Sequence, residues 1–178
     1  MSELTVGSIG GLAVNNNVIS VPSGHRLYHP GAIIQTKTTE YSTFTIYSVA
    51  SYTTITSLSI TPTKTTSQIL FGFSFIVSGI GGFQITRNGS SVWSGPIDAT
   101  GPYTYYENPN NQSAANSGSP RRLASYQFID SPASISELTY AIQIRPYTTA
   151  AASQIAVCEK GSSGNSSVGY VYVQEIAQ

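Results

Sequence analysis

Alternation of side-chain type with a period of two residues constrains the fold of this chain more than any other feature. In the stretch Tyr170-Val171-Tyr172-Val173, aromatic and aliphatic side chains alternate, and similar alternation recurs in several other segments. A period of two places successive side chains on opposite faces of a β-strand. No window of a dozen residues carries apolar side chains at helical spacing without interruption by β-branched residues, Gly or Pro. The sequence therefore predicts an all-β protein, an antiparallel sandwich or barrel.

Eight segments rich in Thr, Val, Ile, Tyr and Phe have the length and composition of strands. They are residues 44–49, 54–61, 68–78, 82–87, 123–129, 138–145, 153–158 and 168–176. Between two strand-like runs, Asn88-Gly89 supplies the residues that adopt the positive φ angles of a type I′ turn, which predicts a tight hairpin between Ile85 and Val92. The glycine cluster at residues 79–82 has neither the spacing nor the following helix of a nucleotide-binding loop, and a strand kink or turn is expected there.

Two segments differ from the strand-rich body at residues 36–178. Residues 1–35 contain short apolar runs separated by Gly, Asn and Pro, too short to close a core. Fully extended, they reach about 115 Å, so we expect a docking arm that lies on a neighbouring subunit or another protein. The candidate docking residues are Leu4, Val6, Ile9, Val18, Ile19 and Val21. The second segment, a long loop at residues 94–120, is dominated by Gly, Pro, Asn, Ser and Tyr; loops of this length are usually functional or disordered.

Charge is scarce in this chain. Of its 178 residues only 9% are charged, the formal net charge is zero and the pI is about 6.7. This balance argues against nucleic acid or an anionic membrane as a partner bound through bulk charge. Soluble surfaces commonly carry about 25–35% charged residues, so either hydroxyl and amide groups coat this surface or partners cover much of it.

Signals for export, disulfide bonding and membrane insertion are also missing from the sequence. The start of the chain does not read as a secretory signal, and the longest apolar stretch, residues 69–77, is too short to span a membrane. The single cysteine, Cys158, excludes an internal disulfide, and its apolar neighbours predict a packed, unreactive thiol.

Catalytic and metal-binding motifs are absent from the sequence. His25 and His29 are four residues apart, which brings ligands together only on a helix, and here Gly and Pro flank them. The acidic residues are scattered, and Asp130, before Ser-Pro, is expected to start a turn by bonding the following backbone. We therefore predict no catalytic residues, no metal and no cofactor.

The long loop holds the one candidate for recognition. Tyr offers rigid amphipathic area and Asn, Ser and Gly offer adaptable hydrogen bonds, the mixture that antibody paratopes use. Two interpretations stay open, contact with a glycan or protein partner, and a loop whose tyrosines cover a subunit interface or the domain edge. The candidate residues are Tyr103, Tyr105, Tyr106, Glu107, Asn108, Arg121 and Arg122.

Several short motifs resemble a family of bacteriophage virion proteins that includes tail-fibre-like and capsid-decorating members. The opening looks like the pattern LTV…I…VPSGH…PGxIIQ of that family, and later runs match its SITP and RNG segments. The matching stretches are Leu4-Thr5-Val6, residues 18–25, residues 30–35, residues 55–70, Arg87-Asn88-Gly89, residues 129–132, residues 138–140 and residues 173–176. The resemblance implies a trimeric jelly roll, similar to complement-type globular heads, and brings no catalytic residues with it.

The resemblance and composition together lead to a non-enzymatic structural protein of the virion, assembled in the host cytoplasm. Association around a threefold axis buries uncharged surface without desolvating ions. A trimeric capsid decoration (cement) protein is the first expectation, with the major capsid protein as partner. The alternative is a short tail fibre or receptor-binding protein, attached to tail proteins and contacting a host surface glycan or protein through the Tyr-rich loop. No heptads or repeats supply the shaft that a fibre usually needs. A third interpretation, a glycan hydrolase built on a β-sandwich, finds no supporting motif.

Overall fold

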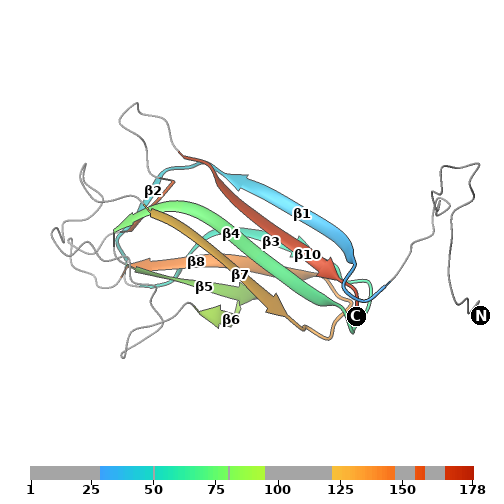
Figure 1. The fold of residues 1–178 in the computed structure, drawn as a ribbon. Coiled ribbons are helices and arrows are strands. Elements are labelled where there is room, and N and C mark those ends of the chain that lie inside the picture. The colour runs from blue at the N-terminus through green and yellow to red at the C-terminus, as the bar shows by residue number, and fades with distance from the viewer. Residues whose placement is uncertain (1–28, 50, 80, 95–121, 147–154, 159–166) are drawn as a thin grey trace, which may run out of the picture.

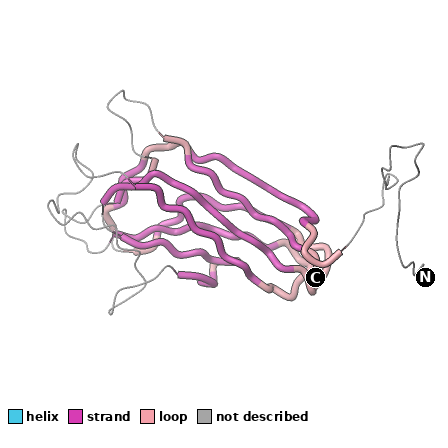
Figure 2. The backbone as a smooth tube through the Cα atoms, viewed as in Figure 1, coloured by secondary structure: helices cyan, strands magenta, loops and turns pink. Residues whose placement is uncertain are grey.

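Two antiparallel sheets packed face to face make up the described part of the chain (Figure 1). The computed structural model describes residues 29–49, 51–79, 81–94, 122–146, 155–158 and 167–178. Within these ranges only strands, turns and irregular segments occur, as the tube in Figure 2 shows. The predicted all-β sandwich is confirmed.

The first sheet is built around β4 (Gln68–Gly79). On one side β4 pairs with β7 (Arg122–Asp130), and on the other with β10 (Gly169–Ile176) and β9 (Ile155–Val157). Beyond these lie β1 (Ile33–Tyr41), which pairs with β10, and β2 (Thr45–Tyr47), which pairs with β9. The second sheet has the order β3 (Thr53–Ile60), β8 (Leu138–Pro146), β5 (Gly81–Arg87) and β6 (Ser90–Ser94).

The strand order is that of a jelly roll. The β1/β2 and β9/β10 pairs each act as one interrupted strand, because Tyr41 pairs with Gly169 and, just beyond the break, Thr45 pairs with Val157. Each pair is counted as one strand, and the strands are numbered along the chain. The neighbours across the first sheet are then strands one, eight, three and six. The second contains strands two, seven, four and five. Two four-stranded sheets connected in this way form the double Greek key of a jelly roll.

The glycine cluster carries the chain from one sheet to the other. β4 ends at Gly79 and β5 begins at Gly81, so a single residue separates a strand of the first sheet from a strand of the second. A Cβ on Gly81 would overlap the backbone carbonyl oxygen of Arg145 in the neighbouring β8. The kink predicted at this cluster is confirmed, and at Gly81 the close approach of another backbone leaves no room for a side chain.

The predicted Asn-Gly hairpin is present with a small shift. Asn88 and Gly89 have φ angles of 50° and 82°, both in the left-handed region that a type I′ turn needs. Ile85 pairs with Trp93 and Thr86 with Ser91, so Val92 lies in a bulge instead of opposite Ile85. The Asn88 side chain also accepts a hydrogen bond of 2.8 Å from the backbone N–H of Thr139, which fixes the turn against β8.

Aromatic side chains from both sheets fill the space between them. Phe71, Phe73 and Phe75 point inward from β4 and are at most 1% exposed. Phe73 meets Phe83 of the second sheet at 5.1 Å between ring centroids, and Phe71 stacks on Tyr140 at 5.7 Å. Each such buried ring contributes about 1.5–3 kcal/mol through the area it removes from water, so this row stabilises the contact between the sheets.

The strand β1 was not among those predicted. Its side chains are exposed or half-buried along the whole strand, because β1 forms an edge of the sheet, and Thr36, Lys37, Thr38 and Glu40 give it a polar composition. Its first three residues, 33–35, fall within the range assigned to the arm and belong to the sandwich. The start of the described body meets the C-terminal residues here, since Gly31 donates a 2.8 Å hydrogen bond to the carbonyl of Ala177.

Candidate interaction surface

The recognition residues expected in the long loop lie mostly outside the described residues. The loop residues outside the described ranges are Tyr103, Tyr105, Tyr106, Glu107, Asn108 and Arg121. The arm residues outside them are Leu4, Val6, Ile9, Val18, Ile19 and Val21. Arg122 is the first residue of β7. The described ends of the loop show that it joins β6 to β7, the last strands of the two sheets on the same side of the sandwich.

The outer side of the first sheet carries large uncharged side chains. We call this the apolar face and define it by Leu70, Leu123, Ile129, Tyr170, Tyr172 and Ile176. Leu123 is 61% exposed, Ile129 55% and Tyr170 55%. The ring of Tyr172 lies over Gly72, where a Cβ would overlap the tip of the ring, so a glycine in β4 allows the tyrosine to lie against the sheet.

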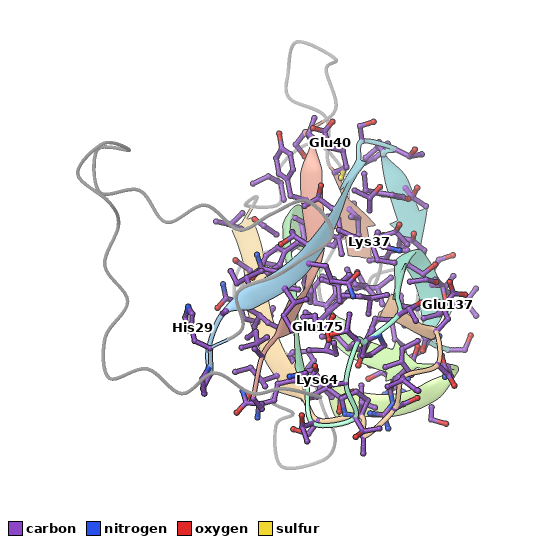
Figure 3. All side chains as sticks on the ribbon, turned by 90° about the vertical axis from the view of Figure 1, so that its right-hand side faces the viewer. His29, Lys37, Glu40, Lys64, Glu137 and Glu175 are labelled. Carbon is purple, nitrogen blue, oxygen red and sulfur yellow. The ribbon has the colours of Figure 1, made fainter. Side chains whose placement is uncertain are left out.

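The apolar face carries one described acidic group, Glu40, at its β1 margin. Glu40 pairs with Tyr170 across the β1–β10 ladder and is exposed, as Figure 3 shows. A partner covering the centre of this face would therefore desolvate hydroxyl and aliphatic groups without removing an ion from water, which is the less costly arrangement.

The outer side of the second sheet has a different chemistry. Ser59 and Thr139 share a 2.8 Å hydrogen bond there, and the Gln84 amide donates to Gln143 at 2.9 Å. None of the large apolar side chains that are exposed in the described residues lies in β3, β5, β6 or β8. Small hydroxyls and amides that bond to each other suit a surface in contact with water, so the apolar face is the better candidate for protein contact.

A row of aromatic side chains lines the open side of the sandwich between β6 and β7. Tyr126 and Phe128 point inward from β7, and Trp93 points inward from β6. Tyr126 lies 5.3 Å from Trp93 and 5.6 Å from Phe73, measured between ring centroids. All three are half-buried and pack on the core, so apolar area remains on this side.

The Glu175 carboxylate is buried and fully engaged in hydrogen bonds. It accepts from Gln35 Nε2 at 2.6 Å, from the N–H and hydroxyl of Thr63 at 2.7 and 2.8 Å, and from Ser67 Oγ at 2.7 Å. Burial alone raises the pKa of this carboxyl, but the hydrogen bonds from Gln35, Ser67 and Thr63 outweigh it and hold the pKa below its usual value.

In the end view of Figure 3, Glu175 lies at the centre while Lys37, Glu40, Lys64 and Glu137 lie around it. The hydrogen bonds to Glu175 fasten the turn at residues 61–67 to β10 and β1. Since all of its partners are donors from the protein itself, the carboxylate has a structural role.

Asp130 links the two sheets. Its carboxylate accepts from Arg87 NH1 at 2.5 Å and from the Tyr140 hydroxyl at 2.6 Å, and both partners come from the second sheet. Burial and the hydrogen bond to Asp130 raise the pKa of Tyr140 above its usual value. The prediction that Asp130 starts a turn by bonding the following backbone is wrong: its side chain bonds across the sandwich, and residues 131–137 form an irregular connection in which Ala133 has a φ of 50°.

Cys158 is buried at the end of β9, as predicted. Its thiol donates to the carbonyl oxygen of Tyr41 at 3.0 Å, and burial raises the pKa of the thiol. A raised pKa lowers the thiolate fraction, which is the reactive form, so this cysteine packs as a small apolar residue.

The described residues contain neither a metal-holding cluster nor a membrane-spanning helix. No group of three or more His, Cys, Asp or Glu side chains in the described ranges is arranged to hold a metal ion. Over those ranges there is likewise no helix with the length and apolar character needed to cross a bilayer.

Comparison with known proteins finds only distant likenesses. No family model and no curated protein match the chain. Among solved structures, the infectious bursal disease virus Gx strain structure is similar over 90% of this chain and 41% of that chain, with 11% identity and a TM-score of 0.42.

Two further structures are similar at the same level. The insecticidal delta-endotoxin Cry8Ea1 of Bacillus thuringiensis is 12% identical over 73% of this chain and 19% of that chain, with a TM-score of 0.38. The dimeric latent PorU of Porphyromonas gingivalis is 10% identical over 84% of this chain and 14% of that chain, with a TM-score of 0.32. The chain thus spans less than half the length of each protein, and similarities of this size do not place it in any of these families.

Proposed function

We propose that this chain is a non-enzymatic structural protein of a bacteriophage virion, a homotrimeric decoration protein of the head that is fastened through its N-terminal leader. The leader is defined here as residues 1–28, which precede the described body. The major capsid protein is the proposed partner, and the role is to add binding free energy at subunit boundaries of the shell.

One observation carries the proposal, the difference between the two outer faces of the jelly roll. The apolar face exposes Leu123, Ile129 and Tyr170, whereas the second sheet exposes small hydroxyls and amides. An exposed sheet face that carries tyrosine and leucine with little charge is of no use to a protein that stays monomeric. For a protein that binds partners, the same face provides contact area. The motif resemblance to phage virion proteins supplies the context for those partners.

The second candidate is a short tail fibre or receptor-binding protein that contacts a host glycan or protein. It is supported by the described strand ends on either side of the Tyr-rich loop: β6 ends at Ser94 and β7 begins at Arg122 toward one end of the sandwich (Figure 1). The described body begins at the opposite end, where Gly31 lies beside Ala177. A protein held at one end with its aromatic loop at the other would have the polarity that a receptor-binding tip needs.

Electron microscopy of phage particles carrying a labelled copy of this protein tests the two candidates. Label over the head at regular positions supports decoration, and label confined to the tail supports the fibre. Deleting residues 1–28 while keeping Gly31 and its bond to Ala177 should abolish attachment to the particle without unfolding the body. Wild-type attachment of that deletion variant would refute the docking role of the leader.

A further inference from the structure

Strand β7 is an edge strand without the usual protection. It pairs with β4 over nine residues with no register shift, from Arg122 opposite Val77 to Asp130 opposite Ile69. It contains neither proline nor lysine; its charged residues are Arg122, at its first position, and Asp130, whose carboxylate is occupied by Arg87 and Tyr140. Natural edge strands are normally short, bulged or charged, because an open edge recruits other strands.

The other described edges do carry such protection. β1 has a register shift between Ile33 and Gln35 and presents Lys37 and Glu40. β3 has a shift between Thr54 and Thr56, and β6 is five residues long with a shift of its own. Compared with these strands, β7 is the long, regular edge of the described sandwich.

Both faces of β7 carry large apolar side chains, and on the outer face these alternate with Ser125 and Gln127. Leu123 and Ile129 point outward and are more than half exposed. Tyr126 and Phe128 point inward and are only half-buried. A further strand beside β7 would cover both sets at once, because its own side chains alternate between the same two faces.

We propose that residues 17–21 of the leader of a second copy of this chain add to the β7 edge as an extra strand. The segment Asn17-Val18-Ile19-Ser20-Val21 has β-branched residues at three of its positions and contains no Gly or Pro. The long loop, the other segment near β7, is rich in Gly, Pro and Asn, which suit a ladder poorly. This inference rests on the proposed docking role of the leader and names its acceptor.

The positions of donor and acceptor allow exchange between copies. The leader joins β1, and β7 lies at the opposite margin of the same sheet, with β10 and β4 between them. Within one copy the leader would have to cross three strand spacings, about 14 Å, around the end of the sandwich. Residues 22–32 could span that distance when extended, so the trapping experiment below distinguishes the two routes. Between copies arranged in a ring, the β1 margin of one copy faces the β7 margin of the next. Such head-to-tail contacts close into a ring, as a trimer requires.

Disulfide trapping in the purified full-length protein tests the contact directly. One tagged copy carries Gln127→Cys, on the exposed outer side of β7, and a copy with a different tag carries one added cysteine, in place of Val18, Ile19, Ser20 or Val21 in turn. The native Cys158 is buried and present in every sample. Mixing and oxidation should give a covalent pair of differently tagged chains for at least one leader position. The matched control replaces Gln127→Cys with Ser57→Cys, exposed on β3 of the other sheet, and should give none.

The outcomes of the trapping experiment are distinct. A disulfide between the two tagged chains supports the exchange. With both cysteines placed in one chain, a disulfide formed within that chain at high dilution, with none between copies, would overturn the exchange. Failure of all four leader positions to react with the Gln127→Cys thiol would overturn the choice of occupant.

Adding charged side chains to the β7 edge gives a second, independent measurement. The double variant Ser125→Lys/Gln127→Lys adds two lysines on the exposed outer side of β7, and the matched control Thr54→Lys/Ser57→Lys adds two on β3. Light scattering should show the mass of a single chain for the β7 variant and the wild-type mass for the control. A cooperative thermal unfolding transition in each variant would show that both remain folded. An unchanged mass in a folded β7 variant would refute the proposal.

Failure of this inference is distinguishable from failure of the proposed function. If deletion of residues 1–28 abolishes attachment to the phage particle but no leader cysteine reacts with β7, the leader docks on another virion protein and only the exchange is wrong. If trapping succeeds while the protein is absent from particles, the exchange holds and the virion role is wrong.

Discussion

At the scale of single residues, the buried carboxylate of Glu175 is the group whose ionisation matters most for stability. It accepts four hydrogen bonds, and its pKa in the folded protein lies below the usual value for a glutamate. A depressed pKa means that ionised Glu175 favours the folded state. This contribution is complete above the ordinary glutamate pKa and is lost as the pH falls through the lower, folded value.

The Glu175→Gln substitution should therefore change both stability and its dependence on pH. The amide presents an N–H₂ group to donors, which leaves at least one buried donor without an acceptor and costs about 1–3 kcal/mol at pH 7. Urea unfolding at about pH 7 and at about pH 3.5, on either side of the ordinary glutamate pKa, should show a smaller loss of stability on acidification for the variant than for the wild type. Identical pH slopes for the two proteins would contradict the assigned role of the carboxylate.

Asp130 offers a test of the contact between the sheets. Tyr140→Phe removes one hydrogen bond to the Asp130 carboxylate and keeps the pairing with Arg87, so about 1 kcal/mol should be lost. Asp130→Ala leaves the buried Tyr140 hydroxyl without its acceptor and should cost more, about 1–3 kcal/mol. Chemical denaturation measures both, and Asp130→Ala supplemented with Tyr140→Phe should recover part of the loss. A double variant less stable than Asp130→Ala alone would argue against the pairing.

These polar networks could not be predicted from the sequence. The donors to Glu175 lie 108 to 140 positions away along the chain, and Arg87 lies 43 positions from Asp130. Only the folded register brings them together, so the sequence indicated an isolated acid in each case. Ser-Pro after Asp130 suggested a local bond to the following backbone, whereas the side chain bonds Arg87 and Tyr140 of the other sheet.

At the scale of elements, the crossing between the sheets depends on Gly81. A Cβ at this position would overlap the Arg145 carbonyl, which is backbone and cannot turn aside. Gly81→Ala should lower the thermal midpoint strongly, since overpacked sites typically lose about 1–3 kcal/mol and backbone contacts relax least. Gly72→Ala is the matched control, because the overlapping atoms there belong to the tip of the Tyr172 side chain, which can swing outward. Equal losses in the two variants would show that the backbone contact is not the cause.

Strand positions followed from the alternation wherever one face of the strand is buried. β8 shows this most clearly, with every second side chain from Leu138 to Pro146 buried. β1 escaped prediction because an edge strand with both faces partly exposed has no strong alternation to detect. The Asn-Gly turn was predictable because its φ angles are a local property, but the bulge at Val92 depends on how β6 meets β5. The candidate surfaces, the apolar face and the β7 edge, required the strand order and could not be read from local sequence.

At the scale of the whole molecule, scarcity of charge should govern how the protein associates. The apolar face and the β7 edge present aliphatic, aromatic and backbone groups, whose attraction is not screened by ions. The mass measured by light scattering should therefore be the same at low and at high sodium chloride. Dissociation at high salt would mean that charged groups hold the copies together, contrary to the contact argued above. Urea unfolding of the same samples serves as the control that salt leaves the fold intact.

The side-by-side arrangement of β1 and β10 has a mechanical consequence. Tension applied to the leader while neighbouring subunits hold the sandwich would act lengthwise along β1. From Gln35 to Tyr41 that strand is hydrogen-bonded to its partner in continuous register. A pull in this direction shears the two strands past each other, so all of the backbone hydrogen bonds between them share the applied force. Peeling, by contrast, would break them one after another. An attachment through the leader, as proposed above, would thus resist tension without the need for any covalent link.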